Sequence, residues 1–445
     1  MKKTLLAVAV MGAFGFSHAQ EIENPLVKKL YEKGVITKEE AVELDEKLYN
    51  KEEESVKADV RIEKEAVKAG EEVKKLKKKL KKISPIKSKA KWFKFDGVAY
   101  LGYTFTDRKY GGDGGDFEIR RGYSVLKAYF NDKDYFRVTL DVSNKPHKPG
   151  KNEGNELDVK FKHLYLYKDL SKSIPHTGVE LGLVHTPWLD FEEHSGWWYR
   201  SISKTFYESS DGAHMLPSAD LGVDFKTKTE HFSAEYGIFN GEGYDHIRRQ
   251  DKGDKPYNVS LEGRFTWHIF GGGTLRYIRG SGKVPKLNPR KDTYTNISLH
   301  VVDSINHRGA NNDLNIYQFH VVYNQPLFLI AGQYIKSHWI NSNEATGKGY
   351  SFNFELRPTS DRKISLFGRY DYWKPENPQD LKSGSSVVGS WEKRNQYIYG
   401  IAYKYNKYVT FILNGITADY DETLTSLPKI SKDYTKYMIT ADVEF

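Results

Sequence analysis

One polar segment of the chain gathers side chains that could recognise a charged solute. It reads LDFEEHSGWWYRSISKTFYESSDGAHMLP and places Arg200 and Lys204 within a few residues of Glu192 and Glu193. Opposed charges across a water-filled passage create a transverse electric field that orients polar solutes, and an excess of one sign selects ions. This segment therefore predicts a protein that selects solutes as they pass through a water-filled channel.

Catalytic chemistry is the main alternative, since some membrane barrels are lipases or proteases. The chain contains no nucleophile-elbow motif and no HExxH zinc motif. It has no cysteine, which excludes thiolate chemistry and disulfide bonds. We interpret lone histidines such as His185 and His268 as residues of a barrel wall. We expect no enzyme activity, no metal site and no cofactor.

The first residues are typical of a secretory signal peptide. Lys2 and Lys3 precede an apolar run from Leu5 to Phe16, and a small-residue cleavage site ends at Ala19. The run is too short for a membrane helix, which needs about 20 residues. We expect residues 1–19 to be removed from an exported chain. The formal net charge of +9 then gives little support for nucleic-acid binding, because an exported protein does not meet nucleic acid.

Two helical elements are predicted before the larger domain. Residues 20–50 read as a helical hairpin, in which Gly34 ends the first helix and a capping box of Thr37 and Glu40 opens the second. Residues 51–91 read as a coiled coil and a lysine-rich linker, with a single solvated helix as the alternative. The apolar seam alternates spacings of four and three residues through Ile62, Ala66, Ala69, Val73, Leu76, Leu80 and Ile83.

Residues 92–445 change to short segments of alternating polarity separated by turn residues, as in FRVTLDVS and YSFNFEL. Tight connections are expected at 131–134, 169–178, 227–230, 270–273, 324–326, 358–362 and 406–407. Long polar connections are expected at 107–117, 144–156, 190–218, 241–256, 280–314, 341–350, 375–393 and 420–434. They alternate strictly, so we predict an all-β fold, an antiparallel transmembrane β-barrel of 16 strands with an N-terminal α-helical coiled-coil extension. As a strand across the wall, YTNISLHVV would put the tight connection at 324–326 on the wrong side of the membrane. This parity argument predicts that YTNISLHVV lies inside the fifth long connection.

The alternation assigns side chains to the two faces of the wall. In FRVTLDVS, Phe136, Val138, Leu140 and Val142 are expected to face lipid. His163 is expected to face outward, at a girdle or a subunit contact. The candidate pore-lining residues on the strands are Arg137, Lys160, Lys162, Arg264, His268, Arg357 and Arg369, and those on the polar segment are Glu192, Glu193, Arg200 and Lys204. These charges either brace the wall as ion pairs or form an ordered field that selects ions.

Several short motifs resemble the phosphate-selective porin O and P family of outer-membrane channels. They are GLVHTPWLDFEEHSGWWYR, LPSADLGVDF, FGRYDYWKP and the terminal aromatic strand. The resemblance covers about Phe93 to Phe445. It implies a trimeric barrel whose third long loop folds inward, with basic pore residues that pass anions. It also implies that the final strand, with Tyr437, Ile439, Val443 and Phe445, is the signal read by the barrel-assembly machinery.

The sequence therefore predicts an outer-membrane porin, in contact with outer-membrane lipid, with a periplasmic stalk and a lean toward anions, including phosphate. Two alternatives stay open. The aromatic rings of the polar segment could form a stacking track in a sugar-preferring porin, or could anchor that segment to the wall. The coiled coil and lysine-rich linker could make the protein a structural tether between the outer membrane and the cell wall. The rings are those of Trp188, Phe191, Trp197, Trp198, Tyr199, Phe206 and Tyr207.

Overall fold

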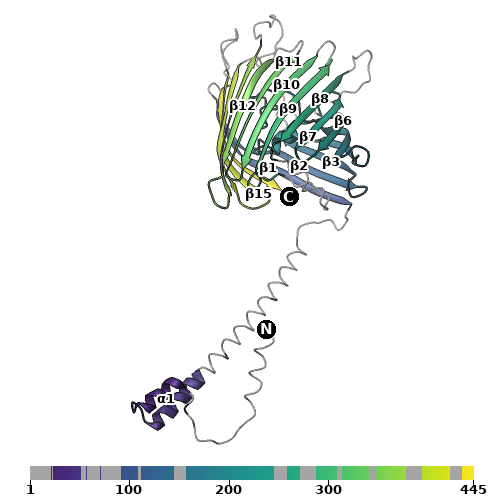
Figure 1. Cartoon of the computed structure of the whole chain (residues 1–445). Helices are drawn as coiled ribbons and strands as arrows, with labels where there is room; N and C mark the ends of the chain where they lie inside the picture. Colours follow the sequence, from purple (N-terminus) through teal and green to yellow (C-terminus); the bar gives the residue numbers. More distant parts are fainter. Residues whose placement is uncertain are drawn as a thin grey trace. The chain divides into compact units, whose positions relative to one another are not determined.

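The computed structural model contains a closed antiparallel β-barrel of sixteen strands (Figure 1). The chain divides into two compact units, Met1–Lys87 and Ser88–Phe445, and each is described by itself. The structure describes residues 22, 24–51, 57, 71, 92–108, 112–144, 157–244, 258–270, 287–307, 313–339, 346–376, 393–420 and 433–445.

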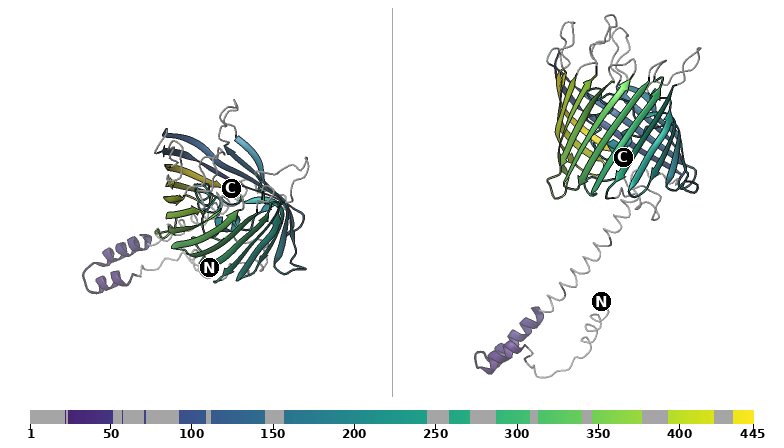
Figure 2. Two further views of the ribbon diagram at one scale, coloured as in Figure 1. Left: turned by 90° about the horizontal axis from the view of Figure 1, so that it is seen from above. Right: turned by 45° about the horizontal axis from the view of Figure 1, so that its top comes forward.

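The strands follow one another around the barrel in chain order, and β1 closes on β16 (Figure 2). Tight turns join most strands at one end, where the longer connection between β8 and β9 also lies, and most of the long connections lie at the other. The strands are β1 (Phe93–Arg108), β2 (Gly114–Tyr129), β3 (Tyr135–Asn144), β4 (Leu157–Asp169), β5 (Thr177–His185), β6 (Ala219–Lys228), β7 (Phe232–Phe239), β8 (Val259–His268), β9 (Tyr294–Ile305), β10 (Leu314–Gln325), β11 (Phe328–Trp339), β12 (Gly347–Leu356), β13 (Ile364–Pro375), β14 (Arg394–Lys404), β15 (Val409–Tyr420) and β16 (Tyr434–Glu444).

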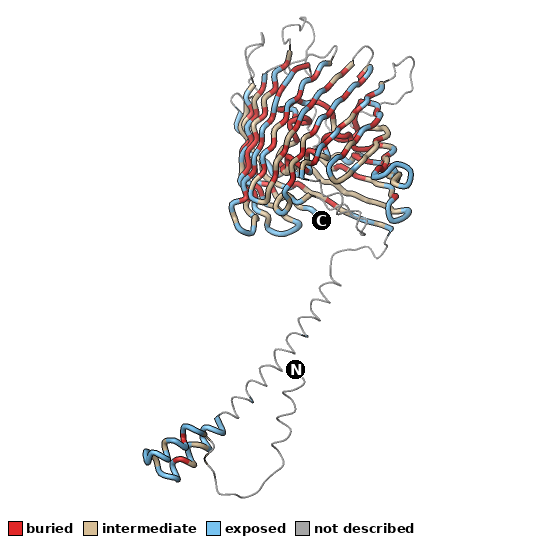
Figure 3. Tube along the Cα trace, viewed as in Figure 1, coloured by how far each residue is buried: buried red, intermediate tan, exposed pale blue. Residues whose placement is uncertain are grey.

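Burial alternates along the strands, as the polarity pattern predicts (Figure 3). In β12, buried and exposed residues alternate over the whole strand. The exposed side chains are largely apolar, and the inward ones are largely polar or charged, which is the inverse of a soluble barrel and suits a wall in lipid. Exposed aromatic rings gather near both ends. They include Phe105, Phe117, Tyr317, Tyr334, Tyr350 and Tyr397 toward the long connections, and Phe95, Phe136, Phe232, Trp267, Tyr403 and Phe411 toward the tight turns.

One strand assignment from the sequence was wrong. YTNISLHVV lies in β9, which pairs with β8 and β10, and is not part of a long connection. Parity fixes how many segments cross the wall but not which of two neighbouring segments does. The tight-turn connection between β8 and β9 therefore spans residues 269–293 in place of 270–273. The connection between β9 and β10 spans 306–313 in place of 280–314.

The outward assignment of His163 was also wrong, because β4 carries a β-bulge. Thr139 pairs with His163 and Leu140 pairs with Phe161, so Lys162 is an extra residue on β4. A bulge leaves two consecutive side chains on one face. Lys162 and His163 are both buried on the inner face, and the His163 ring lies 4.1 Å from the His185 ring between centroids.

The described part of the first unit is helical. α1 (Pro25–Glu32) begins at Asn24, whose side chain accepts from the backbone N–H groups of Leu26 and Val27. Residues 38–51 are also helical, and Thr37 and Glu40 exchange the two hydrogen bonds of a capping box. Among the described residues, no helix is long and apolar enough to cross a membrane. The predicted coiled-coil seam, Ile62, Ala66, Ala69, Val73, Leu76, Leu80 and Ile83, lies outside the described residues.

Candidate constriction inside the barrel

The connection between β5 and β6, residues 186–218, lies inside the barrel. It contains the short helix α3 (Leu189–Glu193), and its apolar side chains pack against inward-facing residues of the wall. Trp188, Leu189, Phe206 and Tyr207 form one buried cluster with residues of β9, β10, β11 and β13. A loop folded inward in this way narrows an aqueous channel that a sixteen-stranded barrel would otherwise leave open. We call residues 186–218 the inner loop.

Strands β8 to β11 hold the first half of the inner loop. Arg264 on β8 donates to the Pro187 carbonyl at 2.8 Å, and its guanidinium lies 4.2 Å over the Phe191 ring. The Tyr294 hydroxyl on β9 donates to the Ser195 carbonyl at 2.7 Å. These contacts satisfy backbone carbonyls that would otherwise be buried without a partner.

Strands β12 to β16 hold the rest of the inner loop, from Gly196 onward. Asn353 on β12 donates to the Gly196 carbonyl at 2.9 Å, and Arg394 on β14 donates to the Gly212 carbonyl at 2.5 Å. Asp211 accepts hydrogen bonds from Tyr420 on β15 and Tyr434 on β16, each at 2.5 Å. Arg369 on β13 donates to the Lys204 carbonyl at 2.9 Å. Each wall strand from β12 to β16 therefore bonds to the inner loop.

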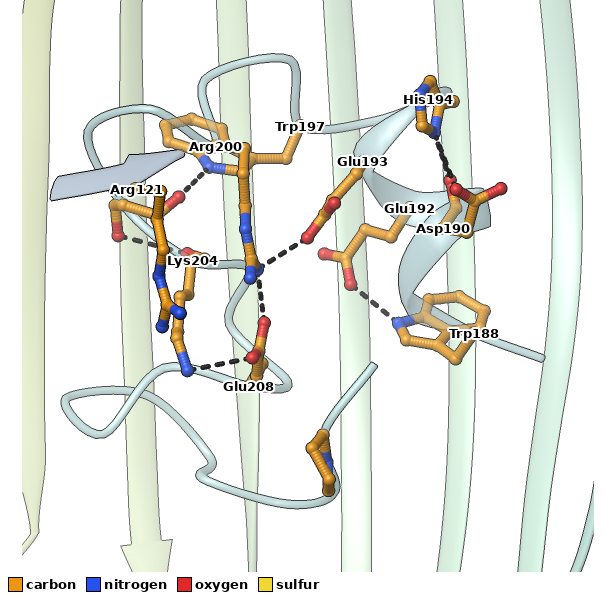
Figure 4. A network of polar contacts seen from close by, with 12 residues as sticks. Arg121, Trp188, Asp190, Glu192, Glu193, His194, Trp197, Arg200, Lys204 and Glu208 are labelled. Atoms are coloured by element: carbon orange, nitrogen blue, oxygen red, sulfur yellow. Dashed lines mark hydrogen bonds and ion pairs between the residues drawn. The ribbon is translucent and has the colours of Figure 1, made fainter. Parts of the chain in front are cut away.

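Four charged side chains of the inner loop pair with one another (Figure 4). Arg200 pairs with Glu193 at 2.6 Å and also with Glu208. Lys204 pairs with the second oxygen of Glu208 at 2.8 Å. Although burial alone would raise it, Arg200 and Lys204 lower the pKa of Glu208 below its usual range. The carboxylates of this cluster are therefore neutralised locally, within the loop.

Glu192 differs from its neighbour Glu193. Its side chain is buried and accepts hydrogen bonds from the Trp188 indole N–H at 2.7 Å and from the Gln333 amide at 2.5 Å. Burial raises the pKa of Glu192 to about 7, against the lowering effect of these two bonds. Glu192 thus bridges α3 to β11 and takes no part in the ion pairs of Arg200 and Lys204.

A second group of basic residues surrounds Tyr123 on β2. The Lys162 ammonium lies 4.5 Å over the Tyr123 ring, and Arg121 and Arg200 interact electrostatically with the same side chain. The Tyr123 hydroxyl is buried and has no hydrogen-bond partner in the described part of the chain. Arg121 pairs with Asp141 at 2.6 Å. The cluster brings together bases from β2, β4 and the inner loop, around one phenol.

Two further bases on the β2–β3 wall have only neutral partners at close range. Lys127 and Arg137 are directly opposite one another across β2 and β3. The Lys127 ammonium lies 4.6 Å over the Tyr135 ring. Arg137 bonds to the Thr139 hydroxyl, the Tyr165 hydroxyl and the His185 ring. Among the described residues, neither base lies within ion-pair distance of a carboxylate.

The structure separates the candidate pore residues into groups. Arg264, Arg369 and Glu192 hold the inner loop to the wall. Lys160 lies 5.0 Å over the Tyr244 ring, on the same strand as Lys162. His268 and Arg357 lie near the tight turns. His268 bonds to Asn296 and Ser233. Arg357 is fully buried between Glu355, Asn324 and the Pro289 carbonyl.

Most aromatic rings of the inner loop are used in packing. Trp188, Trp197, Tyr199, Phe206 and Tyr207 are buried. The Tyr199 ring stacks on Phe367 of β13 at 3.9 Å between centroids. These buried rings offer no free face for a sugar.

Sequence reasoning missed Arg121, Tyr123 and Arg394. A register shift between Tyr100 and Leu101 places Arg120 and Arg121 together beside β1, and a single sequence shows no signal for that shift. Asp211 could be recognised only as one of several acids in a long loop. In the described residues, no group of three or more histidine or carboxylate side chains could hold a metal ion.

No family model matches the chain, and no curated protein matches it in sequence. Solved structures match its fold. An anion-selective porin from Comamonas acidovorans is similar over 79% of this chain and 99% of its own, with 9% identity and a TM-score of 0.53. OprB from Pseudomonas putida is similar over 79% of this chain and 94% of its own, with 8% identity and a TM-score of 0.53. At such low identity these likenesses show the fold alone, a porin-type barrel.

Proposed function

We propose that this protein is an outer-membrane porin, a passive channel for small hydrophilic solutes that prefers anions. The observation that carries the proposal is the charge arrangement around the inner loop. Its carboxylates Glu193 and Glu208 are paired within the loop, whereas the wall of β2–β4 presents Lys127, Arg137 and Lys162 without close carboxylate partners among the described residues. An excess of positive charge beside a narrow passage favours anions.

The buried Tyr123 hydroxyl supports the same proposal. A phenol can donate one hydrogen bond, and Lys162 and Arg121 lie beside it. An anion that displaces the inner loop from this hydroxyl would meet a donor together with basic side chains. This combination suits oxyanions, phosphate included, and agrees with the resemblance to the phosphate-selective porin O and P family.

The assembly and location belong to the same proposal. The apolar outer face between two aromatic bands suits a barrel that crosses the outer membrane, and both ends of the barrel chain, β1 and β16, then have their free termini on the periplasmic side. We infer a homotrimer, with residues 20–91 as a periplasmic stalk whose lysines meet the cell wall. The final strand would be the signal for the barrel-assembly machinery.

The sugar-preferring alternative loses its main support, because five of the seven loop rings are buried. The tether alternative rests on residues 51–91, nearly all of which lie outside the described residues. Neither alternative is favoured by a contact in the barrel.

The test is the reversal potential of the refolded protein in a planar bilayer under a salt gradient. A potential of anion sign, with block of the chloride current by added phosphate, supports an anion porin with an oxyanion site. Cation selectivity would contradict the anion preference, but the proposal that the protein is a channel would stand. An absence of conductance would contradict the channel itself, and steps of three equal conductances would support the trimer.

A further inference from the structure

Four exposed lysines form a continuous row on the outer face of the barrel. Lys336 on β11 pairs with Lys348 on β12, and Lys348 pairs with Lys374 on β13. Lys393 directly precedes Arg394, whose partner on β13 is Trp373, so Lys393 continues the row beside Lys374. We call these residues the lysine row.

The lysine row faces outward, away from the lumen. Lys336 lies between the buried residues Ile335 and Ser337, and Lys348 lies between the buried residues Gly347 and Gly349. All four lysines are exposed. The row is therefore separate from the inner loop and from the basic residues that line the lumen.

The row lies at the end of the barrel that carries the long connections. Lys336 and Lys348 flank the connection between β11 and β12, and Lys374 and Lys393 flank the connection between β13 and β14. In the orientation proposed above, this end lies at the outer leaflet of the membrane.

A band of aromatic rings fixes the depth of the row. Tyr334, Tyr350 and Tyr372 lie directly opposite one another two residues further into the wall. The rings of Tyr350 and Tyr372 stack at 5.1 Å between centroids, and the Lys393 ammonium lies 5.7 Å from the centre of the Tyr372 ring. Aromatic bands of this kind lie at the level of the lipid headgroups, so the lysines just beyond them lie among the headgroups.

Repulsion among the four lysines favours a negatively charged partner. Like charges directly opposite on neighbouring strands destabilise a sheet, and here the opposition is repeated across four strands. In the described part of the chain, none of the four lysines lies within ion-pair distance of a carboxylate. Neighbouring strands are about 4.8 Å apart, so the row spans roughly 14 Å. That span can engage a headgroup that carries more than one phosphate.

We propose that the lysine row binds the phosphorylated headgroup of a glycolipid in the outer leaflet. The four ammonium groups pair with headgroup phosphates, while the tyrosine band beneath them packs against the upper parts of the acyl chains. The site would hold one class of lipid against β11–β14 and would relieve the repulsion among the lysines.

The experiment uses the refolded full chain in an uncharged detergent, titrated with fluorescent lipid A, a diphosphorylated glycolipid. The variant carries Lys336→Gln, Lys348→Gln, Lys374→Gln and Lys393→Gln. We expect its affinity for lipid A to fall at least about tenfold, since each lysine near a charged lipid surface contributes to binding. The matched control carries Lys172→Gln, Lys363→Gln, Lys404→Gln and Lys407→Gln at the tight-turn end, and should bind as the wild type does.

Two further arms identify the ligand. Lipid A without its phosphates should bind equally weakly to the wild type and to the row variant. Inorganic phosphate at the lipid concentration should not displace lipid A. Equal affinities of the row variant and the wild type would overturn the proposal, as would equal losses in the row variant and the control. Displacement by inorganic phosphate would assign the row to free phosphate.

Two readouts separate this site from other roles. The row variant should unfold at the same temperature as the wild type in uncharged detergent, or at a higher one, because repulsion is removed. A lower unfolding temperature would show that the row is structural, and would overturn the proposal. The single-channel conductance should not change, so the lipid site can fail while the porin proposal stands, and the reverse also holds.

Discussion

The guanidinium of Arg369 on β13 lies 4.2 Å from the centre of the Trp197 ring and donates to the Lys204 carbonyl at 2.9 Å. One wall residue therefore holds two points of the inner loop that are seven residues apart. Arg369 also pairs with Asp371 at 2.9 Å, on the same strand. Arg369 thus positions the inner loop as well as the wall. Guanidinium N–H groups that do not bond to Asp371 donate to the inner loop.

Replacing Arg369 by Gln should loosen the inner loop. We expect the mean single-channel conductance and the open-channel current noise to rise, because Trp197 and Lys204 lose their common anchor. Breaking one side of a buried ion pair also costs about 3–5 kcal/mol of stability. Single-channel recording and thermal unfolding measure the two effects.

Arg357→Gln is the matched control for this loss of stability. Arg357 forms a buried pair with Glu355 on β12 at 2.9 Å, but its other contacts are with residues near the tight turns. It should destabilise the barrel to a similar degree without changing the conductance. An unchanged current trace in the Arg369 variant would contradict the anchoring role.

Replacing Lys127 and Arg137 together by Gln should weaken anion selectivity. Both bases face the lumen and neither has a close carboxylate partner among the described residues, so their charge acts on passing ions. We expect the anion-to-cation permeability ratio to fall at least about twofold, as measured by the reversal potential in a salt gradient. The control is Lys374→Gln, which removes a charge from the outer face. If the double variant and the Lys374 control shift the reversal potential equally, the inner wall does not determine the selectivity.

The sequence predicted the strand number and the inward loop because both depend on patterns that a single chain carries. Alternating polarity reports which face each residue occupies, and connection lengths report which end each turn occupies. The bulge at Lys162 and His163 broke this inference, since one extra residue reverses the face of every later side chain on the strand. The choice of β9 failed for a related reason, because two adjacent segments satisfied the same parity.

The sequence could not predict the role of each inward-facing basic residue. Arg137, Arg264 and Arg369 all occupy inward positions with the same polarity pattern. Alternation does not tell whether a segment distant in the chain covers a given part of the wall. Arg264 and Arg369 donate to the backbone of the inner loop, whereas the hydrogen bonds of Arg137 go to wall residues.

Glu192 should make the stability of the barrel depend on pH. Burial raises its pKa in the folded state to about 7, whereas an unfolded chain has a glutamate pKa near 4.3. The folded state therefore holds the proton more tightly, so stability present at low pH is lost as the pH rises from about 4.3 to about 7. The loss of stability is about 4 kcal/mol. Urea unfolding between pH 4 and pH 8 measures it.

Glu192→Gln should flatten this part of the profile, because the amide carries no charge. Its single oxygen can still accept from one of the two donors, the Trp188 indole or the Gln333 amide. Glu230→Gln, in the turn between β6 and β7, is the control and should keep the wild-type dependence. If the Glu192 variant loses stability with rising pH as steeply as the wild type, another group is responsible.

Phe445 should stabilise the closure of the barrel by covering Gly97. The two residues exchange backbone hydrogen bonds between β1 and the end of β16, at 2.9 and 3.0 Å. A Cβ atom added at Gly97 would lie 2.1 Å from the Phe445 ring, so the ring occupies the space that the glycine leaves. An aromatic ring across a strand glycine stabilises the pair. Phe445→Ala should therefore cost about 1 kcal/mol, and Gly97→Ala should displace the ring at a similar cost.

A double-mutant cycle isolates this contact from the signal proposed for the last strand. Since both single variants lose the same ring contact, the double variant should be less destabilised than the sum of the singles, with a coupling of about 1 kcal/mol. The measurement is urea unfolding after refolding into detergent, where no assembly machinery is present. Strict additivity would show that Phe445 does not act through Gly97. If Phe445→Ala folds normally in detergent yet fails to reach the membrane of cells, its role lies in recognition by the assembly machinery and not in closure.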